Sequence, residues 1–296
     1  MRISRMLAAG APTVSFEFFP PRDDAGFDRL FATIEALRPL RPSYVSVTYG
    51  AGGGTRRKTV DLVQRIKHEI GIESMAHLTC VGSTRDELAE VLDRLRAGAV
   101  ENVLPLRGDP PRGRDRFEPV PGGFRYANEL VGFIRGRYDF CLGGACYPET
   151  HPEAPSPEVD LENLKRKVDA GSEFLITQLF FDNDDFLRFR DRAVRAGIGV
   201  PIVAGIMPIR SLKQTRRFAS LCGARIPEDL LSRMEAVQHD PSAVGRIGIE
   251  HATWQCRRLL DDGVAGLHFY TLNRSTATRA IYRDIRSVLA SPAAVA

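Results

Sequence analysis

Two carboxylates are candidates for chemistry, Glu17 because of its apolar neighbours and Asp109 because a turn fixes it at the mouth of a loop. Glu17 lies inside the apolar run 14–19 (V-S-F-E-F-F), and Asp109 lies in the turn 107–110 (R-G-D-P). Apolar neighbours withdraw a carboxylate from water and favour its protonated form, which suits a general acid or base near neutral pH. The plainer alternatives are a strand glutamate paired with an arginine at Glu17 and an ordinary loop turn at Asp109.

Three further segments have the composition of ligand-binding loops. The segment 147–153 (Y-P-E-T-H-P-E) displays a tyrosine, a histidine and two carboxylates on a loop that two prolines stiffen. The basic run 165–167 (K-R-K) suits phosphate binding, although a solvated helix face explains it equally well. The glycines of segment 50–54 allow close backbone approach to a ligand or simply form a flexible turn.

The sequence lacks the motifs of metal sites, serine hydrolases and nucleotide-binding loops. His77 and Cys80 have the spacing H-x-x-C, but the sequence contains neither H-E-x-x-H nor a paired-cysteine motif, so we expect no metal site. A serine-hydrolase G-x-S-x-G elbow and a G-x-x-x-x-G-K-[ST] phosphate loop are also absent from the sequence. The nearest match to G-x-G-x-x-G, segment 50–55, has Thr55 in place of the third glycine.

The elements that must position these residues alternate regularly. Eight short runs rich in β-branched and aromatic residues alternate with amphipathic stretches. The runs start near Thr13, Ser43, Ser74, Glu101, Tyr138, Ser172, Val200 and Val264. Repeated strand–helix units of about 30 residues predict a parallel sheet, and eight of them close into a barrel. The fold class is therefore α/β, an eight-stranded parallel (β/α) TIM barrel, with one or two extra helices between Ile206 and Val264 before the last strand. An open doubly wound sheet is the alternative, which the missing nucleotide fingerprint disfavours.

The composition fits one globular domain. The chain has 296 residues, of which 43% are hydrophobic and 26% charged, so collagen-like, disulfide-scaffold and disordered classes are excluded. Without a linker or repeat, we expect a single catalytic domain over residues 1–296. The net charge of +4 is too small to indicate a nucleic-acid partner. No run approaches the roughly 18 apolar residues of a membrane span, and five scattered cysteines favour a reducing, cytoplasmic location.

Polar residues gather where the predicted strands end. They are Glu17, Thr48, Tyr49, His77, Thr79, Arg107, Asp109, Tyr147, Gln178, Tyr270 and Asn273. Because TIM-barrel active sites lie at the carboxyl ends of the strands, we expect these side chains to share one mouth.

Eight motifs in this order carry a family resemblance. They are S-F-E-F-F-P-P (15–21), V-S-V-T-Y-G-A (45–51), H-L-T-C (77–80), L-R-G-D-P (106–110), Y-P-E-T-H-P-E-A (147–154), N-L-K-R-K-V-D-A-G (163–171), T-Q-L-F-F-D (177–182) and F-Y-T-L-N-R (269–274). Together they closely resemble the bacterial methylenetetrahydrofolate reductase family over nearly the whole chain.

The resemblance implies an FAD-containing barrel without the regulatory extension of the eukaryotic members. It implies the reduction of 5,10-methylenetetrahydrofolate to 5-methyltetrahydrofolate by NADH or NADPH. Hydride would pass through the flavin in a ping-pong reaction, because nicotinamide and folate would use the same mouth in turn. The partners implied are these small molecules and further copies of the chain in a homo-oligomer. The sequence fits NADH and NADPH equally, since the expected nicotinamide site shows no arginine cluster for a 2′-phosphate.

The resemblance also assigns roles to single positions. Glu17 matches the general acid, and Asp109 matches the carboxylate beside the flavin pyrimidine and the folate pterin, where its charge would tune the flavin potential. The positions that match flavin contacts are Thr48, Tyr49, Ala51, His77, Arg107, Gly108, Asp109, Tyr126, Ala127, Tyr147, His151, Ala154, Asp160, Asn163, Arg166 and Lys167. Those that match folate or nicotinamide contacts are Glu17, Thr48, Asp109, Gln178, Gln214, Phe218 and Arg274. Arg166 and Lys167 would bind the cofactor pyrophosphate.

One segment departs from the family pattern, and two other functions are possible. The loop 110–124, with Arg112, Arg114 and Arg116, is longer than usual between the R-G-D turn and the following tyrosine. A ligand-binding barrel without catalysis would keep the pocket, but it would not need an acid such as Glu17 in an apolar setting. A reductase that takes hydride directly from nicotinamide would be active without flavin.

Overall fold

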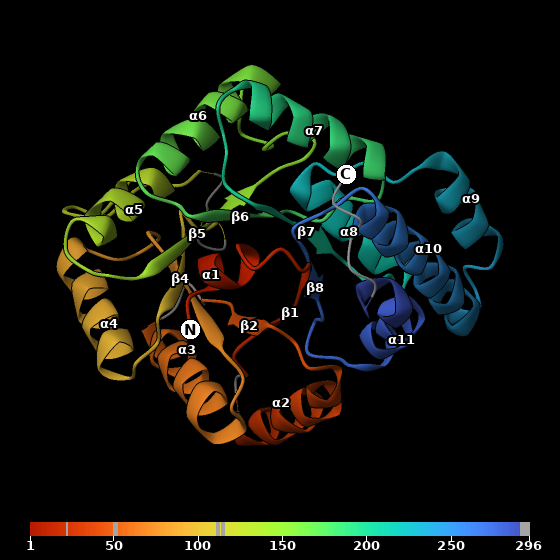
Figure 1. Cartoon of the computed structure of the whole chain (residues 1–296), viewed down its shortest axis with the longest axis horizontal. Coiled ribbons are helices and arrows are strands. Elements are labelled where there is room, and N and C mark those ends of the chain that lie inside the picture. Colours follow the sequence, from red (N-terminus) through yellow and green to blue (C-terminus); the bar gives the residue numbers. More distant parts are fainter. Residues whose placement is uncertain (22, 50–52, 111–112, 114–115, 291–296) are drawn as a thin grey trace.

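The strands of the computed structural model form one closed, parallel barrel in chain order, β1-β2-β3-β4-β5-β6-β7-β8 (Figure 1). The structure describes residues 1–21, 23–49, 53–110, 113 and 116–290. The strands are β1 (Thr13–Phe18), β2 (Tyr44–Val47), β3 (Ser74–Thr79), β4 (Asn102–Leu106), β5 (Cys141–Cys146), β6 (Phe174–Thr177), β7 (Ile202–Ile206) and β8 (Gly266–Tyr270). The TIM-barrel prediction is therefore confirmed, and the open doubly wound alternative is wrong.

The helices surround this barrel. They are α1 (Ile3–Leu7), α2 (Asp24–Leu37), α3 (Gly53–Arg65), α4 (Arg85–Ala97), α5 (Ala127–Arg135), α6 (Pro157–Asp169), α7 (Asn183–Arg195), α8 (Leu212–Cys222), α9 (Glu228–Ala236), α10 (Pro241–Asp261) and α11 (Thr276–Ala290). The single-turn helices Arg38–Leu40 and Ile66–Ile70 follow α2 and α3. Between β7 and β8 lie α8, α9 and α10, so the prediction of extra helices there is confirmed. Because α10 packs against α7, β7 and α11, it completes the outer ring, and α8 and α9 are the additions.

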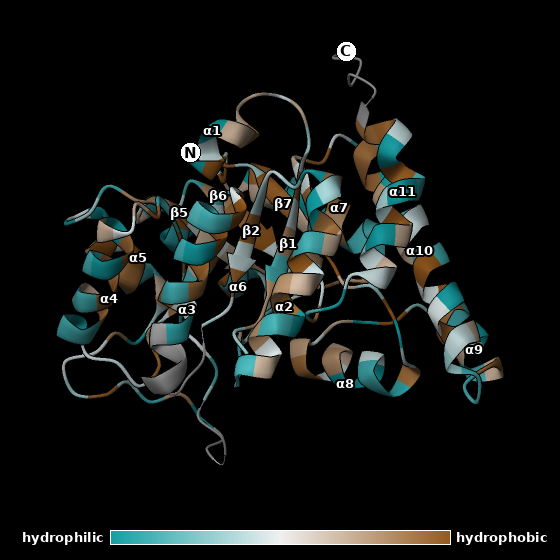
Figure 2. Cartoon of the chain, turned by 90° about the horizontal axis from the view of Figure 1, so that it is seen from below, coloured by the Kyte–Doolittle hydropathy of each residue, from teal (hydrophilic) through white to brown (hydrophobic). Residues whose placement is uncertain are grey.

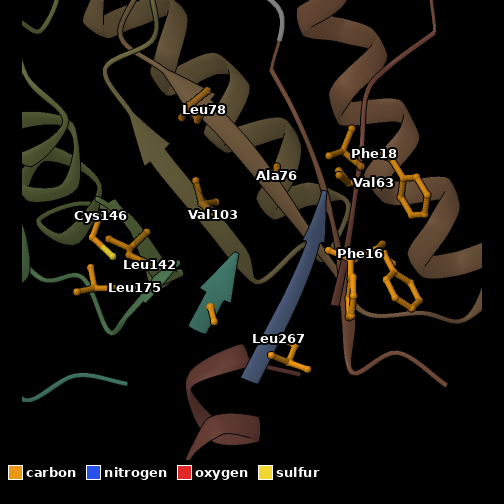
Figure 3. Close-up of a cluster of buried hydrophobic side chains, with 14 of the residues drawn as sticks. Phe16, Phe18, Val63, Ala76, Leu78, Val103, Leu142, Cys146, Leu175 and Leu267 are labelled. Atoms are coloured by element: carbon orange, nitrogen blue, oxygen red, sulfur yellow. The ribbon is translucent and has the colours of Figure 1, made fainter. Parts of the chain in front are cut away.

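The two faces of each strand have different partners, because successive side chains point to opposite sides. Phe16 and Phe18 of β1 face outward and join the core between strands and helices, together with Leu78 of β3 and Leu267 of β8 (Figure 3). Their neighbours Ser15 and Glu17 therefore face the barrel interior.

The barrel interior is apolar at its amino-terminal end. Tyr44, Met75, Leu104 and Phe174 form a buried cluster there with Ile3 of α1. Helix α1 covers this end of the barrel, opposite α8 (Figure 2). Polar inward-facing residues such as Glu17 and His77 lie nearer the carboxyl ends of the strands. The candidate catalytic side chains are therefore at the carboxyl end of the barrel, which we call the mouth.

Helix α8 lies at the end of the molecule opposite α1, where the strands have their carboxyl ends (Figure 2). It begins after Ser211, whose hydroxyl accepts from the Gln214 backbone N–H, as a helix cap does. At the other end, an added Cβ on Gly223 would lie 3.3 Å from Pro152, so the helix reaches the loop after β5. The buried side chain of Leu212 packs into a satellite core with Leu179 and Met207. The helix is thus anchored against the loops that follow β5, β6 and β7.

Candidate active site

Glu17 is a buried carboxylate held between two imidazoles. Its side chain is 9% exposed, and Oε2 lies 3.6 Å from Nε2 of His77 on β3 and 3.6 Å from Nε2 of His268 on β8. No arginine among the described residues forms an ion pair with Glu17, so the simple strand ion pair is wrong. The predicted burial of this carboxylate among apolar neighbours is confirmed, and histidines supply its polar contacts.

His77 is withdrawn from water and has spare hydrogen-bonding capacity. Burial lowers the pKa of His77 to about 4 against the opposing pull of Glu17, so the ring is neutral at neutral pH. Its Nε2 and the nearby Thr79 Oγ1 are buried without a hydrogen-bond partner in the described part of the chain. Buried polar atoms are rarely left unpaired, so these two atoms are available to a polar ligand at the mouth.

His268 contacts the Glu17 carboxylate from deeper inside the barrel, at the level of Ser15. The sequence analysis missed this residue. Its Nδ1 lies 2.7 Å from Ser15 Oγ, its Nε2 lies 3.4 Å from Ser46 Oγ, and its ring stacks on Tyr44. A period-two reading of the last strand would have found it, since His268 and Tyr270 share the inward face. The buried polar chain therefore continues from Glu17 toward the middle of the barrel.

Tyr270 is held at the mouth by a hydrogen bond, and Gly205 on the neighbouring strand leaves room for its ring. Its hydroxyl donates to the Thr177 carbonyl oxygen at 2.5 Å, and burial raises the pKa of Tyr270 well above its usual value. A Cβ on Gly205 would lie 2.3 Å from this carbonyl oxygen and 2.7 Å from the Tyr270 ring, so only glycine leaves room for this arrangement. Tyr270 remains a protonated donor.

Arg107 connects two loops of the mouth. Its guanidinium donates to both carboxylate oxygens of Glu153, at 2.5 and 2.6 Å, and lies over the Phe117 ring. Gly108 follows with a φ of +85°, a conformation that favours glycine, and turns the chain so that Asp109 is exposed at the rim. The R-G-D turn thus presents a carboxylate beside a fixed arginine.

The stiffened loop after β5 is ordered by its own hydrogen bonds. The Tyr147 and His151 rings meet edge to face at 4.7 Å, and the Ala154 N–H donates to the His151 carbonyl oxygen at 2.8 Å. The His151 N–H donates to Asp160 Oδ2 at 2.9 Å, which ties the loop to α6. Burial lowers the pKa of His151, and the positive charge of Arg107 adds to this effect.

The basic run on α6 divides between two environments. Ser156 caps the helix and Pro157 begins it, and Asp160 and Lys167, seven residues apart, lie on the same face two turns from each other. Lys167 Nζ donates to the Ala145 carbonyl oxygen of β5 at 2.6 Å, and burial lowers its pKa. Arg166 is exposed and donates to Asn163 Oδ1 at 3.0 Å. The solvated-face interpretation therefore describes Arg166 and is wrong for Lys167.

The remaining expected positions flank the same mouth. Thr48 and Tyr49 follow β2, Tyr126 and Ala127 begin α5, Gln178 follows β6, Gln214 and Phe218 lie on α8, and Arg274 follows β8. The expected flavin positions thus run from the end of β2 to α6, and the expected folate positions run from β6 around to β1. Ala51 lies outside the described residues, as do residues 111–112 and 114–115 of the long loop.

The residues that the structure describes contain no group of three or more His, Cys, Asp or Glu residues arranged to hold a metal ion. Their helices include none with the length and apolar character of a membrane span.

Comparison with known proteins identifies relatives over nearly the whole chain. A protein-family model described as methylenetetrahydrofolate reductase matches residues 2–286. The 5,10-methylenetetrahydrofolate reductase of Salmonella typhimurium is 43% identical over 272 residues, which cover 92% of this chain and 90% of that protein. Methylenetetrahydrofolate reductase (NADH) 1 of Arabidopsis thaliana is 40% identical over 283 residues, which cover 92% of this chain and 48% of that protein. The chain therefore spans about half the length of this plant relative and nine tenths of the bacterial one.

Solved structures share the fold at low sequence identity. An uncharacterized protein from Clostridium thermocellum, described as binding two copies of 5-methyl-5,6,7,8-tetrahydrofolic acid, has a TM-score of 0.62 at 14% identity. The match covers 97% of this chain and 99% of that one. At this identity the likeness shows a common barrel fold.

Proposed function

The chain belongs to the methylenetetrahydrofolate reductase family, and on that premise we propose that it reduces 5,10-methylenetetrahydrofolate to 5-methyltetrahydrofolate with electrons from NADH or NADPH. The observation that carries this proposal is the buried Glu17 carboxyl at the mouth, between His77 and His268. A barrel that only bound folate would have no need of an acid withdrawn from water at that place.

The residues of the mouth fit FAD as the resident cofactor. The unpaired Nε2 of His77 and Oγ1 of Thr79 are suited to the polar edge of a flavin ring, and Lys167 and Arg166 would bind the pyrophosphate. The other residues that we assign to the cofactor are Thr48, Tyr49, Ala51, Arg107, Gly108, Asp109, Tyr126, Ala127, Tyr147, His151, Ala154, Asp160 and Asn163. When bound, FAD supplies a centre that accepts hydride from NAD(P)H and later gives it to the folate.

Glu17 is the general acid in this proposal. Opening the five-membered ring of the methylene folate requires a proton on the departing nitrogen, and it leaves an iminium carbon that can accept hydride. Glu17 is suited to give that proton because it is nearly buried and because His77 beside it is neutral. His268 keeps the carboxyl in place through its own contact with Ser15.

Asp109 and the residues around it orient the substrate. The exposed Asp109 carboxylate follows Arg107, which Glu153 holds by two hydrogen bonds, so its position at the rim is restricted. Asp109 would accept hydrogen bonds from the pterin, with Gln178, Gln214, Phe218 and Arg274 along the rest of the folate. Nicotinamide and folate would occupy the same mouth in turn, which gives ping-pong kinetics.

The cellular setting follows from the same proposal. All five cysteines are free thiols, which suits the reducing cytoplasm in which reduced folates are kept. Association into a homo-oligomer stays a prediction, to be checked by the mass of the protein in solution.

Product analysis tests the proposed function. The purified protein, supplied with FAD, NADH or NADPH and 5,10-methylenetetrahydrofolate, should form 5-methyltetrahydrofolate in proportion to the nicotinamide oxidised. Glu35→Gln, a change of an exposed glutamate on α2, serves as a control that keeps the activity. Tight folate binding without product under either nicotinamide would contradict the proposal and identify a binding barrel.

A further inference from the structure

Arg225 lies where three elements of the protein meet, just beyond the end of α8. Its backbone N–H donates to Glu149 Oε1 at 2.6 Å, on the loop after β5. Its guanidinium donates to Asp182 Oδ2 at 2.7 Å and to Asp185 Oδ2 at 3.1 Å, where α7 begins. One residue therefore joins the end of α8 to α7 and to the loop after β5.

The cluster around Arg225 contains more carboxylates than guanidinium groups. Burial raises the pKa of Glu149 to about 7, Asp185 and Asp182 add to this rise, and Arg225 opposes it. Arg188 also pairs with Asp185, so three carboxylates share two guanidinium groups. The side chains of Asp182 and Asp185 are only 25% and 14% exposed, so water and salt screen their charges incompletely. Without Arg225, an ionised Glu149 would face two aspartates and be repelled by them.

Glu149 connects this cluster to residues that the proposed function assigns to FAD. It lies in the chain between Tyr147 and His151, whose rings meet edge to face at 4.7 Å. Pro148 and Pro152 restrict the backbone of the same loop, because the proline ring fixes one of the two backbone torsion angles. A displacement of Glu149 would therefore move Tyr147 and His151 with it.

We propose that Arg225 is a positioning residue, which holds the loop after β5 in its FAD-binding arrangement by neutralising the charges of Glu149 and the two aspartates of α7. This inference rests on the proposed function, because it takes Tyr147 and His151 as cofactor contacts. Arg225 acts through the loop and does not itself bind the cofactor. When the guanidinium charge is removed, Glu149 is repelled from α7 and draws the loop out of place, so FAD binds less tightly.

Arg225→Gln is the test variant, and Arg233→Gln is its matched control. Arg233 is a similarly exposed arginine of α9 that pairs with Glu250 at 2.9 Å, so its change also removes one charge and one ion pair. Fluorescence titration at about pH 8.5, above the Glu149 pKa of about 7, would measure the FAD dissociation constant while this carboxyl is ionised. Arg225→Gln should raise that constant about fivefold, and Arg233→Gln should match the wild type.

Removing the charge of Glu149 should rescue Arg225→Gln. In the double variant with Glu149→Gln, the amide still accepts the backbone N–H but is no longer repelled by the aspartates, so FAD affinity should return to within about twofold of the wild type. A general loss of stability would not be reversed in this way. Hydrogen exchange without FAD gives a second measurement. The amides of residues 147–154 should exchange faster in Arg225→Gln and at the wild-type rate in the double variant.

Two results would overturn this inference. One is an unchanged FAD dissociation constant, or unchanged hydrogen exchange of the loop, in Arg225→Gln. The other is a loss of FAD affinity that Glu149→Gln does not restore, which would assign Arg225 to the general stability of the fold. Failure of the proposed function is separable, since a wild type that binds FAD through an Arg225-dependent loop but forms no 5-methyltetrahydrofolate would contradict the reductase alone.

Discussion

Glu17 Oε2 lies 3.6 Å from His268 Nε2, on the strand paired with β1. The register puts Ser15 opposite His268 and Glu17 opposite Tyr270, and the Ser15 hydroxyl lies 2.7 Å from His268 Nδ1. The imidazole therefore bridges two levels of the barrel and holds the carboxyl at the mouth. A buried carboxyl so fixed can deliver a proton to one place.

Glu17→Gln should separate the two half-reactions. The amide keeps the shape of the side chain but cannot give up a proton, so folate reduction should fall by about 10²-fold or more. NADH or NADPH oxidation with an artificial electron acceptor should remain near the wild-type rate. Stopped-flow measurement of each half-reaction checks this. Equal losses in both would mean that Glu17 maintains the site and donates no proton.

Lys167→Met should weaken FAD retention. Lys167 is the half-buried cation of the run and faces β5, whereas Lys165 pairs with Asp169 on the helix exterior. The loss of one charge-assisted contact to a phosphate should raise the FAD dissociation constant about tenfold. Fluorescence titration with FAD measures it, with Lys165→Met as the control. Identical FAD affinity in Lys167→Met and Lys165→Met would argue against a pyrophosphate site at Lys167.

Gly205→Ala should disturb the Tyr270 arrangement and lower stability. The added methyl would lie 2.3 Å from the Thr177 carbonyl oxygen and 2.7 Å from the Tyr270 ring, so the free energy of unfolding should fall by about 1–3 kcal/mol, as for other overpacked cores. Gly199→Ala is the control, because an added Cβ there meets no atom within 4 Å. Urea unfolding of both variants provides the comparison. A Gly205→Ala protein as stable as Gly199→Ala would show that both Tyr270 and the backbone at Thr177 move aside freely.

The raised pKa of Glu149 should make the free energy of unfolding fall as the pH rises toward neutral. Burial raises the pKa of Glu149 from its ordinary 4.5 to about 7, with Asp185 and Asp182 adding to the rise, while the Arg225 backbone N–H bound at 2.6 Å and the Arg225 charge oppose it. The folded protein therefore keeps a proton that the unfolded chain has lost, and the stability from this group, complete below 4.5, disappears as the pH reaches 7.

Glu149→Gln tests this pH dependence. The amide stays neutral and keeps an acceptor oxygen, so the variant should gain stability relative to the wild type between about pH 5 and about pH 8. Thermal unfolding at several pH values measures it, with the exposed Glu35→Gln as the reference. A constant difference across this range would rule out a proton on Glu149.

The strand order was predictable because each strand and each helix leaves a local periodic signal. The run near Ser74 becomes β3, and the run near Tyr138 begins a few residues before β5 at Cys141. The position of Glu17 near a strand end followed from the same pattern. Such features depend on neighbours in the sequence, so local reasoning finds them.

The contacts across the barrel were not predictable in this way. The Glu17–His268 contact joins residues from opposite ends of the chain, and the Glu149–Arg225 contact joins two loops. The first depends on the closure of the barrel, and the second depends on how the end of α8 meets the loop after β5. The division of Arg166 and Lys167 between solvent and β5 likewise depends on how α6 rotates against the sheet.

A visible spectrum under anaerobic conditions tests the central claim most directly. The purified protein should carry flavin absorbance that NADH or NADPH removes and that 5,10-methylenetetrahydrofolate then restores, with 5-methyltetrahydrofolate as the product. A colourless protein that takes up no FAD, or a flavin that neither nicotinamide reduces, would contradict the account.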